Sequence, residues 1–106
     1  MSNLVDKKCV SHEKMTLLVP EEIKNCLDQL KQWEVLDGKK IRKIFKFEYF
    51  AEAMEFVSRV AEVAEQEGHH PDIVIHYNKV EIILWSHFVS GLSENDFIVA
   101  VKVDNI

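Results

Sequence analysis

The segment Glu67-Gly68-His69-His70-Pro71-Asp72, followed by the run from Ile73 to His87, decides the fold and contains most of the candidate chemistry. Three of the chain's five histidines, His69, His70 and His87, lie at the two ends of this stretch. Imidazole has an unperturbed pKa of about 6.5, so a site built from it can donate and accept protons near neutral pH.

The two adjacent histidines are expected in a loop. Gly68 is typical of the residue that follows a helix, and Pro71 disfavours helical backbone at the residue before it. Pro71 also cannot donate a hydrogen bond to a sheet, so the strand is expected to begin after it. The loop therefore joins a helix end to a strand start, which is a common location for chemistry.

Residues 73–77 and 80–85 predict a β-hairpin. Both are rich in β-branched and aromatic residues, and only Asn78-Lys79 lies between them. A two-residue loop at these positions pairs His76 with Glu81 across the strands.

In that register, His70 falls opposite His87 when the count is extended beyond the strands. Pro71 interrupts the ladder, so the distance stays open, but both imidazoles reach the same end of the hairpin. His69 enters from the adjoining turn, and the three histidines are therefore expected around one site.

Residues 33–36 and 41–47 predict a second hairpin around Asp37-Gly38. A three-residue loop aligns apolar residues with apolar residues and Glu34 with Arg42. The Asp-Gly pair alone favours a two-residue loop, so both registers stay open.

Helices are expected in three other segments. Pro20 suits a first helical turn, and residues 47–67 are rich in Ala and Glu with an apolar stripe at helical spacing. Ser93-Glu94-Asn95-Asp96 resembles a capping box, with Asp in place of the usual Glu or Gln. Residues 97–103 are ambiguous, because their β-branched content favours a strand while the preceding cap favours a helix.

With a helix in that last segment, the order of elements is α-β-β-α-β-β-α. The two hairpins then form a four-stranded antiparallel sheet with helices on one face, which is a two-layer α+β domain. We expect residues 1–16 to be a flexible N-terminal arm, in which His12 is a solvated surface residue, and residues 17–106 to form the single domain.

Composition narrows the class of protein. The chain has 106 residues, 47% of them hydrophobic, and a net charge of −5, which predicts one domain and gives no basis for nucleic-acid binding. It contains no run of 18 apolar residues, and residues 1–10 lack the apolar core of a signal peptide. Cys9 and Cys26 form no CxxC motif and suit free thiols. We therefore expect a cytoplasmic protein without a membrane span.

On these residues, the chain resembles the pterin-4a-carbinolamine dehydratases. The matching pattern is His69-His70-Pro71-Asp72, Tyr77-Asn78-Lys79-Val80, Ser86-His87 and Gly91-Leu92-Ser93-Glu94, with Trp33, Phe45-Lys46-Phe47, Ala53-Met54 and Phe56 upstream. The resemblance extends from about Pro20 onward and implies a helix over residues 97–103. Two departures are Ile73, where some members carry Trp, and Trp85, where a small residue is common. Of these two, Trp85 is the better candidate for a pocket wall.

The resemblance implies a hydro-lyase that dehydrates 4a-hydroxytetrahydropterin to quinonoid dihydropterin in tetrahydrobiopterin recycling. This chemistry needs only proton transfers, so the resemblance implies neither a cofactor nor a metal. Catalysis is assigned to His69, His70 and His87. Substrate binding is assigned to His69, His70, Pro71, Ser86, His87, Phe88 and Val89. The resemblance also implies a homodimer or homotetramer, and a functional link to an aromatic amino acid hydroxylase that supplies the substrate.

Two other functions compete with this one. The first is a zinc site made from the three histidines, with His76 or Glu81 as a further ligand, although no HExxH or CxxC frame is present. The second is a small oligomeric interaction module without catalysis, because fold and composition do not give function. Some members of the family are also described as dimerisation cofactors of transcription factors, so binding and catalysis are compatible. The match over most of the chain ranks the dehydratase first.

Overall fold

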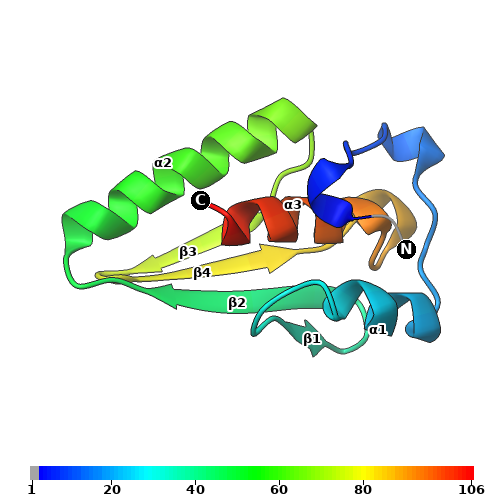
Figure 1. Cartoon of the computed structure of the whole chain (residues 1–106), viewed down its shortest axis with the longest axis horizontal. Helices are drawn as coiled ribbons and strands as arrows, with labels where there is room; N and C mark the ends of the chain where they lie inside the picture. Colours follow the sequence, from blue (N-terminus) through cyan, green and yellow to red (C-terminus); the bar gives the residue numbers. More distant parts are fainter. Residues whose placement is uncertain (1–2) are drawn as a thin grey trace.

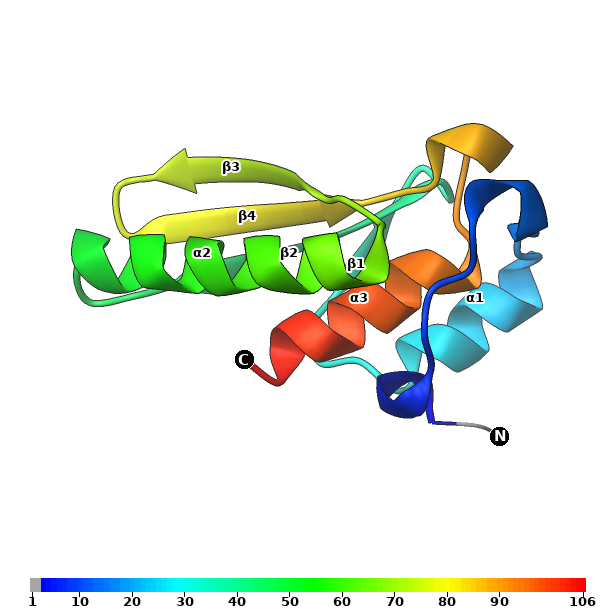
Figure 2. The same cartoon turned by 90° about the horizontal axis from the view of Figure 1, so that it is seen from above.

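Four strands form one antiparallel sheet in the order β1-β2-β4-β3 in the computed structural model, which describes residues 3–106 (Figure 1). The strands are β1 (Glu34–Leu36), β2 (Lys40–Lys46), β3 (Asp72–His76) and β4 (Lys79–Leu84). The helices α1 (Pro20–Leu27), α2 (Phe50–Glu67) and α3 (Glu94–Asp104) lie on one face of the sheet (Figure 2). The predicted α+β fold and its element order are confirmed. None of the helices in residues 3–106 is long and apolar enough to cross a membrane.

The β1–β2 hairpin has the three-residue loop that aligns opposite charges. Glu34 pairs with Arg42 and Leu36 with Lys40. Asp37 and Gly38 occupy the left-handed region, at φ 53° and 67°, which these two residue types tolerate better than most. Cross-strand complementarity therefore outweighs the preference of Asp-Gly for a two-residue loop.

The β3–β4 hairpin turns one residue earlier than predicted, at Tyr77-Asn78 rather than Asn78-Lys79. Asn78 anchors this turn to the end of β2. Its side-chain amide donates to the Phe47 carbonyl at 2.8 Å, and its own carbonyl accepts from the Phe47 N–H at 2.8 Å. A contact between distant segments thus decides the loop, with Tyr77 at φ 55°.

The observed loop changes which residues pair across the strands, but it does not change the side of the sheet on which each side chain lies. His76 pairs with Lys79 rather than Glu81, and Glu81 lies opposite Val74. The register differs by two residues, and side chains alternate with a period of two, so each residue keeps its predicted side of the sheet. Glu81 instead binds Arg42 of β2, with Nη1 and Oε2 3.1 Å apart.

Residues 97–103 are helical, as the cap and the family resemblance indicated. The Asp96 carboxylate accepts a hydrogen bond from the Ser93 N–H at 3.0 Å and caps the first turn of α3. Phe97 through Val101 are all buried, so the helix is covered on every side. Its β-branched residues therefore serve core packing and do not indicate a strand.

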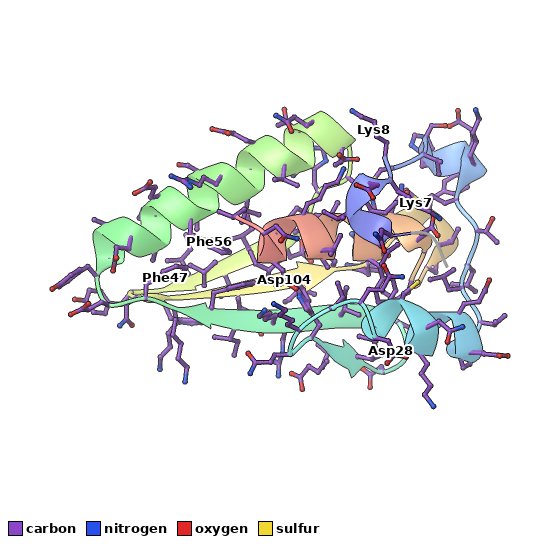
Figure 3. The ribbon with its side chains drawn as sticks, in the orientation of Figure 1. Lys7, Lys8, Asp28, Phe47, Phe56 and Asp104 are labelled. Carbon is purple, nitrogen blue, oxygen red and sulfur yellow. The ribbon has the colours of Figure 1, made fainter. Side chains whose placement is uncertain are left out.

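Aromatic side chains pack together at the end of the domain where β2 leads into α2. Phe56 of α2 lies 4.6 Å from Phe45 and 5.1 Å from Phe47 between ring centroids, and Figure 3 shows Phe47 and Phe56 between the helix and the sheet. Asp104 at the end of α3 accepts hydrogen bonds from Trp33 Nε1 at 2.9 Å and Lys43 Nζ at 2.7 Å. These contacts tie the helical layer to β2.

The N-terminal segment packs across α3 and the end of α2 (Figure 2). Leu4 joins the core with 2% of its surface exposed. The Cys9 N–H donates to Glu67 Oε1 at 2.9 Å, and Val10 exchanges two backbone hydrogen bonds with the Asn95 side chain, at 3.0 and 2.8 Å. The flexibility expected for residues 1–16 stays a prediction, and Met1 and Ser2 lie outside the described residues.

Glu67 joins this segment to two helices. Its Oε2 accepts from Lys102 Nζ of α3 at 2.5 Å, and its side chain is only 5% exposed. Burial alone would raise the pKa of Glu67, but the hydrogen bonds from Lys102 and the Cys9 N–H outweigh that effect and lower it. Burial and the neighbouring Glu67 raise the pKa of the Cys9 thiol to about 12, so it stays protonated.

We predict that Glu67→Gln destabilises the protein by about 1–3 kcal/mol at pH 7, because the half-buried Lys102 ammonium loses its charged acceptor. The pKa of a glutamate in the unfolded chain is about 4.3, and the folded value lies lower. The wild-type advantage should therefore be complete above about pH 5. It should be lost as the pH falls through the lowered folded-state pKa.

Urea unfolding at several pH values measures this effect. The matched control is Glu62→Gln, an exposed glutamate on the same helix, which should change stability by less than about 0.5 kcal/mol. A wild-type advantage over Glu67→Gln that grows on acidification would contradict the argument.

Candidate functional site

A cleft of about 880 Å³ opens where the end of α2, the end of β4 and the N-terminal segment meet. The short 3₁₀ helices η2 (His12–Lys14) and η3 (His87–Val89) lie at this end of the molecule (Figures 1 and 2). The cleft is lined by Ser11, His12, Met15, Gly68, His69, His70, Pro71, Asp72, Trp85, His87 and Phe88. The structure thus brings all three predicted histidines to one cavity.

His69 is the buried member of the three, with 7% of its surface exposed. Its backbone follows Gly68, which ends α2 at φ 67°, as predicted. Its Nε2 lies 2.6 Å from Asp96 Oδ1, a distance typical of a strong hydrogen bond. A carboxylate can only accept, so Nε2 carries the proton, and neutral His69 has its lone pair on Nδ1. No residue of the described chain hydrogen-bonds this Nδ1, which leaves it free to meet a ligand.

Asp96 is fully buried and satisfied by hydrogen bonds on both carboxylate oxygens. Its Oδ2 accepts from Ser86 Oγ at 2.8 Å and from the Ser93 N–H at 3.0 Å. The Ser86 and Ser93 hydroxyls lie 2.6 Å apart. This set of donors at a helix N-terminus holds a buried carboxylate in one position, and His69 is held with it.

His70 points to the exposed rim. Its Nε2 lies 2.5 Å from Glu65 Oε2, and its side chain is 61% exposed. The two adjacent histidines therefore have different environments. His69 is fixed by a buried partner, whereas His70 is held by a surface contact that solvent weakens.

His87 begins η3 and is not part of the β3–β4 ladder, which ends at the pair of Asp72 and Ile83. The expected cross-strand position opposite His70 is therefore wrong. The His87 ring instead packs on Trp85, with centroids 3.8 Å apart and planes at 36°. Lys40 Nζ lies 4.7 Å from the centroid of the same indole. As expected, Trp85 contributes to the cleft wall.

The other predicted binding residues divide into two groups. Pro71 and Phe88 line the cleft, and Phe88 is 61% exposed there. Ser86 lies buried behind the histidines, bound to Asp96, and Val89 is half-buried without lining the cavity.

Sequence reasoning did not place Asp96 or His12 in the site. The one signal for Asp96 was its unusual presence at the third position of a capping box. His12 is exposed, as expected, but it lines the cleft, with its ring 5.3 Å from that of Phe88.

The three histidines have different neighbours, namely Asp96, Glu65 and Trp85. Within residues 3–106, no three His, Cys, Asp or Glu side chains are grouped closely enough to hold a metal ion. His76 and Glu81, the extra ligands of the zinc alternative, lie outside the cleft lining. The arrangement therefore does not match the ligand set of the zinc alternative.

Comparisons with known proteins identify the relatives of this chain. The family described as pterin 4 alpha carbinolamine dehydratase matches residues 16–106. A protein of Rubrobacter xylanophilus is 42% identical over 107 residues, covering 100% of both chains. One of Alkaliphilus metalliredigens is 42% identical over 106 residues, covering 98% of this chain and 96% of the relative. Both carry the provisional name pterin-4-alpha-carbinolamine dehydratase.

Two solved structures are also similar. A transcriptional coactivator/pterin dehydratase from Brucella melitensis has 33% identity and a TM-score of 0.81, covering 85% of this chain and 97% of the other. A pterin dehydratase-like protein identified as a RuBisCO assembly factor in the alpha-carboxysome has 25% identity and a TM-score of 0.60. It covers 71% of this chain and 88% of the other.

We predict that Asp96→Asn destabilises the fold by about 2–3 kcal/mol, because an amide has one acceptor oxygen for the three donors that now share a carboxylate. Thermal unfolding measures the loss. The matched control is Glu94→Gln on the same turn, which loses only a part-exposed contact with Lys7 and should cost less than about 1 kcal/mol. Equal melting temperatures for the two variants would show that the Asp96 network contributes no more to stability than the part-exposed contact of Glu94 does.

Proposed function

Because the chain belongs to the pterin-4-alpha-carbinolamine dehydratase family, we propose that it dehydrates 4a-hydroxytetrahydropterin to quinonoid dihydropterin. In this reaction the C4a–O bond breaks, N5 loses its proton, a C4a–N5 double bond forms and water leaves. One proton is taken and one is given. The single observation that carries the proposal is a buried imidazole, His69, held by Asp96 at the wall of a cleft that three further histidines line.

His69 is proposed as the base that removes the N5 proton. Its Nδ1 is the nitrogen with the free lone pair, and the Asp96 carboxylate would offset the positive charge that develops when Nδ1 is protonated. A base held by a buried partner also loses little conformational entropy when it reacts.

His87 is proposed as the acid that protonates the departing hydroxyl. The indole face of Trp85, with its centroid 3.8 Å from that of the His87 ring, favours a cationic partner through its quadrupole. His70 is proposed mainly to bind and orient the pterin, because its Nε2 contacts Glu65 at the exposed rim. Pro71, Ser86, Phe88 and Val89 are proposed to shape or support the binding surface.

The substrate would come from an aromatic amino acid hydroxylase, so the protein would act in pterin recycling. Purified protein tests the function directly, through the loss of 4a-hydroxypterin absorbance faster than the spontaneous rate. Acceleration should persist in EDTA, because the proposed steps use only imidazoles. Loss of activity in EDTA, restored by zinc, would favour the zinc alternative, and a spontaneous rate in every condition would reject the dehydratase.

We predict that His69→Ala and His87→Ala each lower kcat by about 10²–10⁴-fold, the usual cost of losing a general acid or base. His70→Ala should raise KM more than it lowers kcat. Steady-state kinetics with circular dichroism on each variant separate these effects from misfolding. The matched control is His76→Ala, an exposed histidine of β3 away from the cleft, which should behave as wild type. Near-normal kcat in both His69→Ala and His87→Ala, with native spectra, would remove these two residues from the mechanism.

A second function has specific support from the comparisons, since one similar structure is titled a transcriptional coactivator as well as a pterin dehydratase and another an assembly factor. The alternative is a small oligomeric interaction module without catalysis. It would predict that the histidine substitutions leave partner binding intact and that no dehydration is accelerated.

We predict that the chain is a dimer or tetramer in solution. β1 and β3 are the sheet edges, and Ile75 and Tyr77 at the β3 edge are 39% and 67% exposed. A small domain gains stability when a second copy covers such an edge. Light scattering at micromolar concentration measures the mass, and a monomer there would contradict the prediction.

A further inference from the structure

We propose that residues 11–16 form a strap along the candidate site and that His12 and Met15 contact the substituent at C6 of the bound pterin. The strap would then determine which pterins are accepted. This inference rests on the proposed dehydratase function and deepens it, because it concerns choice among substrates and not the proton transfers.

The strap supplies one wall of the cleft. Ser11, His12 and Met15 line the cavity together with the three histidines. His12 has 70% of its side chain exposed, and its ring lies 5.3 Å from that of Phe88 on η3. Imidazole, phenyl and thioether groups together make an adaptable surface for a small organic substituent.

The strap is anchored where it begins. Val10 exchanges its two backbone hydrogen bonds with the Asn95 side chain, and the Cys9 N–H donates to Glu67. Asn95 immediately precedes Asp96, and Glu67 lies two residues before His69. The segments that hold the His69–Asp96 pair therefore also hold the start of the strap.

The strap is anchored again where it ends. The Leu18 N–H donates to the Leu92 carbonyl at 2.9 Å. Leu17 packs so closely on Gly91 that a Cβ at that glycine would lie 2.7 Å from Leu17 Cδ1. Gly91 closes the loop that carries His87, through backbone hydrogen bonds of 2.7 and 3.2 Å with Ser86. Residues 11–16 are thus a span held at both ends against the two loops that carry the histidines.

Pterin chemistry indicates what this span would meet. In the pterin ring, C6 is bonded to N5, the atom that loses its proton. A substituent on C6 therefore lies next to the reacting edge of the ring. Histidines that reach N5 would occupy one part of the cleft, and the substituent would lie in the part beside it. The strap residues border the same cavity as His69 and His87 and have no assigned role in proton transfer.

The test compares two 4a-hydroxytetrahydropterins, one with a 6-methyl group and one with a 6-dihydroxypropyl group. For His12→Ala and Met15→Ala, the ratio of kcat/KM between the two substrates should change by about 10-fold, the lower end of the discrimination that one methylene contact provides. Lys14→Ala is the matched control, because Lys14 is exposed in the same 3₁₀ helix but does not line the cleft.

The outcomes separate the strap from the function. An active wild type whose substrate ratio changes by less than twofold in both variants would overturn the strap and leave the dehydratase intact. An inactive wild type would reject the dehydratase. The role of the strap is then tested by the Kd values of the two tetrahydropterins, measured by tryptophan fluorescence. A Kd ratio that shifts in the strap variants supports the inference, whereas an unchanged ratio or no binding overturns it.

Discussion

The Asp96 carboxylate accepts a helix-capping N–H, a serine hydroxyl and the imidazole of His69 at the same time. A carboxylate without accessible surface is costly unless such partners satisfy it, so the three donors must come together for the domain to fold. They belong to the turn after α2, the loop after β4 and the start of α3. A single anion therefore joins the three segments that shape the site.

These hydrogen bonds make the orientation of His69 depend on the stability of the fold. His69 cannot move without leaving a buried carboxylate short of a donor, so its orientation is maintained by folding energy and needs no bound ligand. His70 and His87 lack such a constraint, since one contacts an exposed glutamate and the other packs on an indole. The site thus combines one rigid imidazole with two more adaptable ones, which suits a reaction that must bind a flat ring and move two protons.

Local chemistry in the sequence was sufficient for most of the fold. Gly68 and the Ser93–Asp96 box predicted where a helix ends and where another begins, and the Glu34–Arg42 pairing pointed to one of the two β1–β2 registers left open, the one that the structure has. The β3–β4 turn was wrong because its position depends on Asn78 binding Phe47, 31 residues away in the chain. The sequence predicted Asp96 as a helix cap and did not predict it as the partner of His69. The two residues are 27 apart in the chain, and no local sequence pattern connects them.

The N-terminal segment makes contacts that its sequence did not predict. Residues 1–16 have no helical or strand period, and the sequence therefore predicted a flexible arm, which stays a prediction. The structure places Leu4 in the core and fixes Cys9 and Val10 by hydrogen bonds to Glu67 and Asn95. Those bonds use backbone groups of the arm, so they leave no trace in its side-chain pattern. The family match begins at residue 16, whereas the proposed acid, base and binding histidines all lie after it. The strap of residues 11–16 is anchored through backbone groups of Cys9, Val10 and Leu18, so under the proposed function its side chains could change the choice of substrate while the Asp96 network and the proton-transfer groups stay in place.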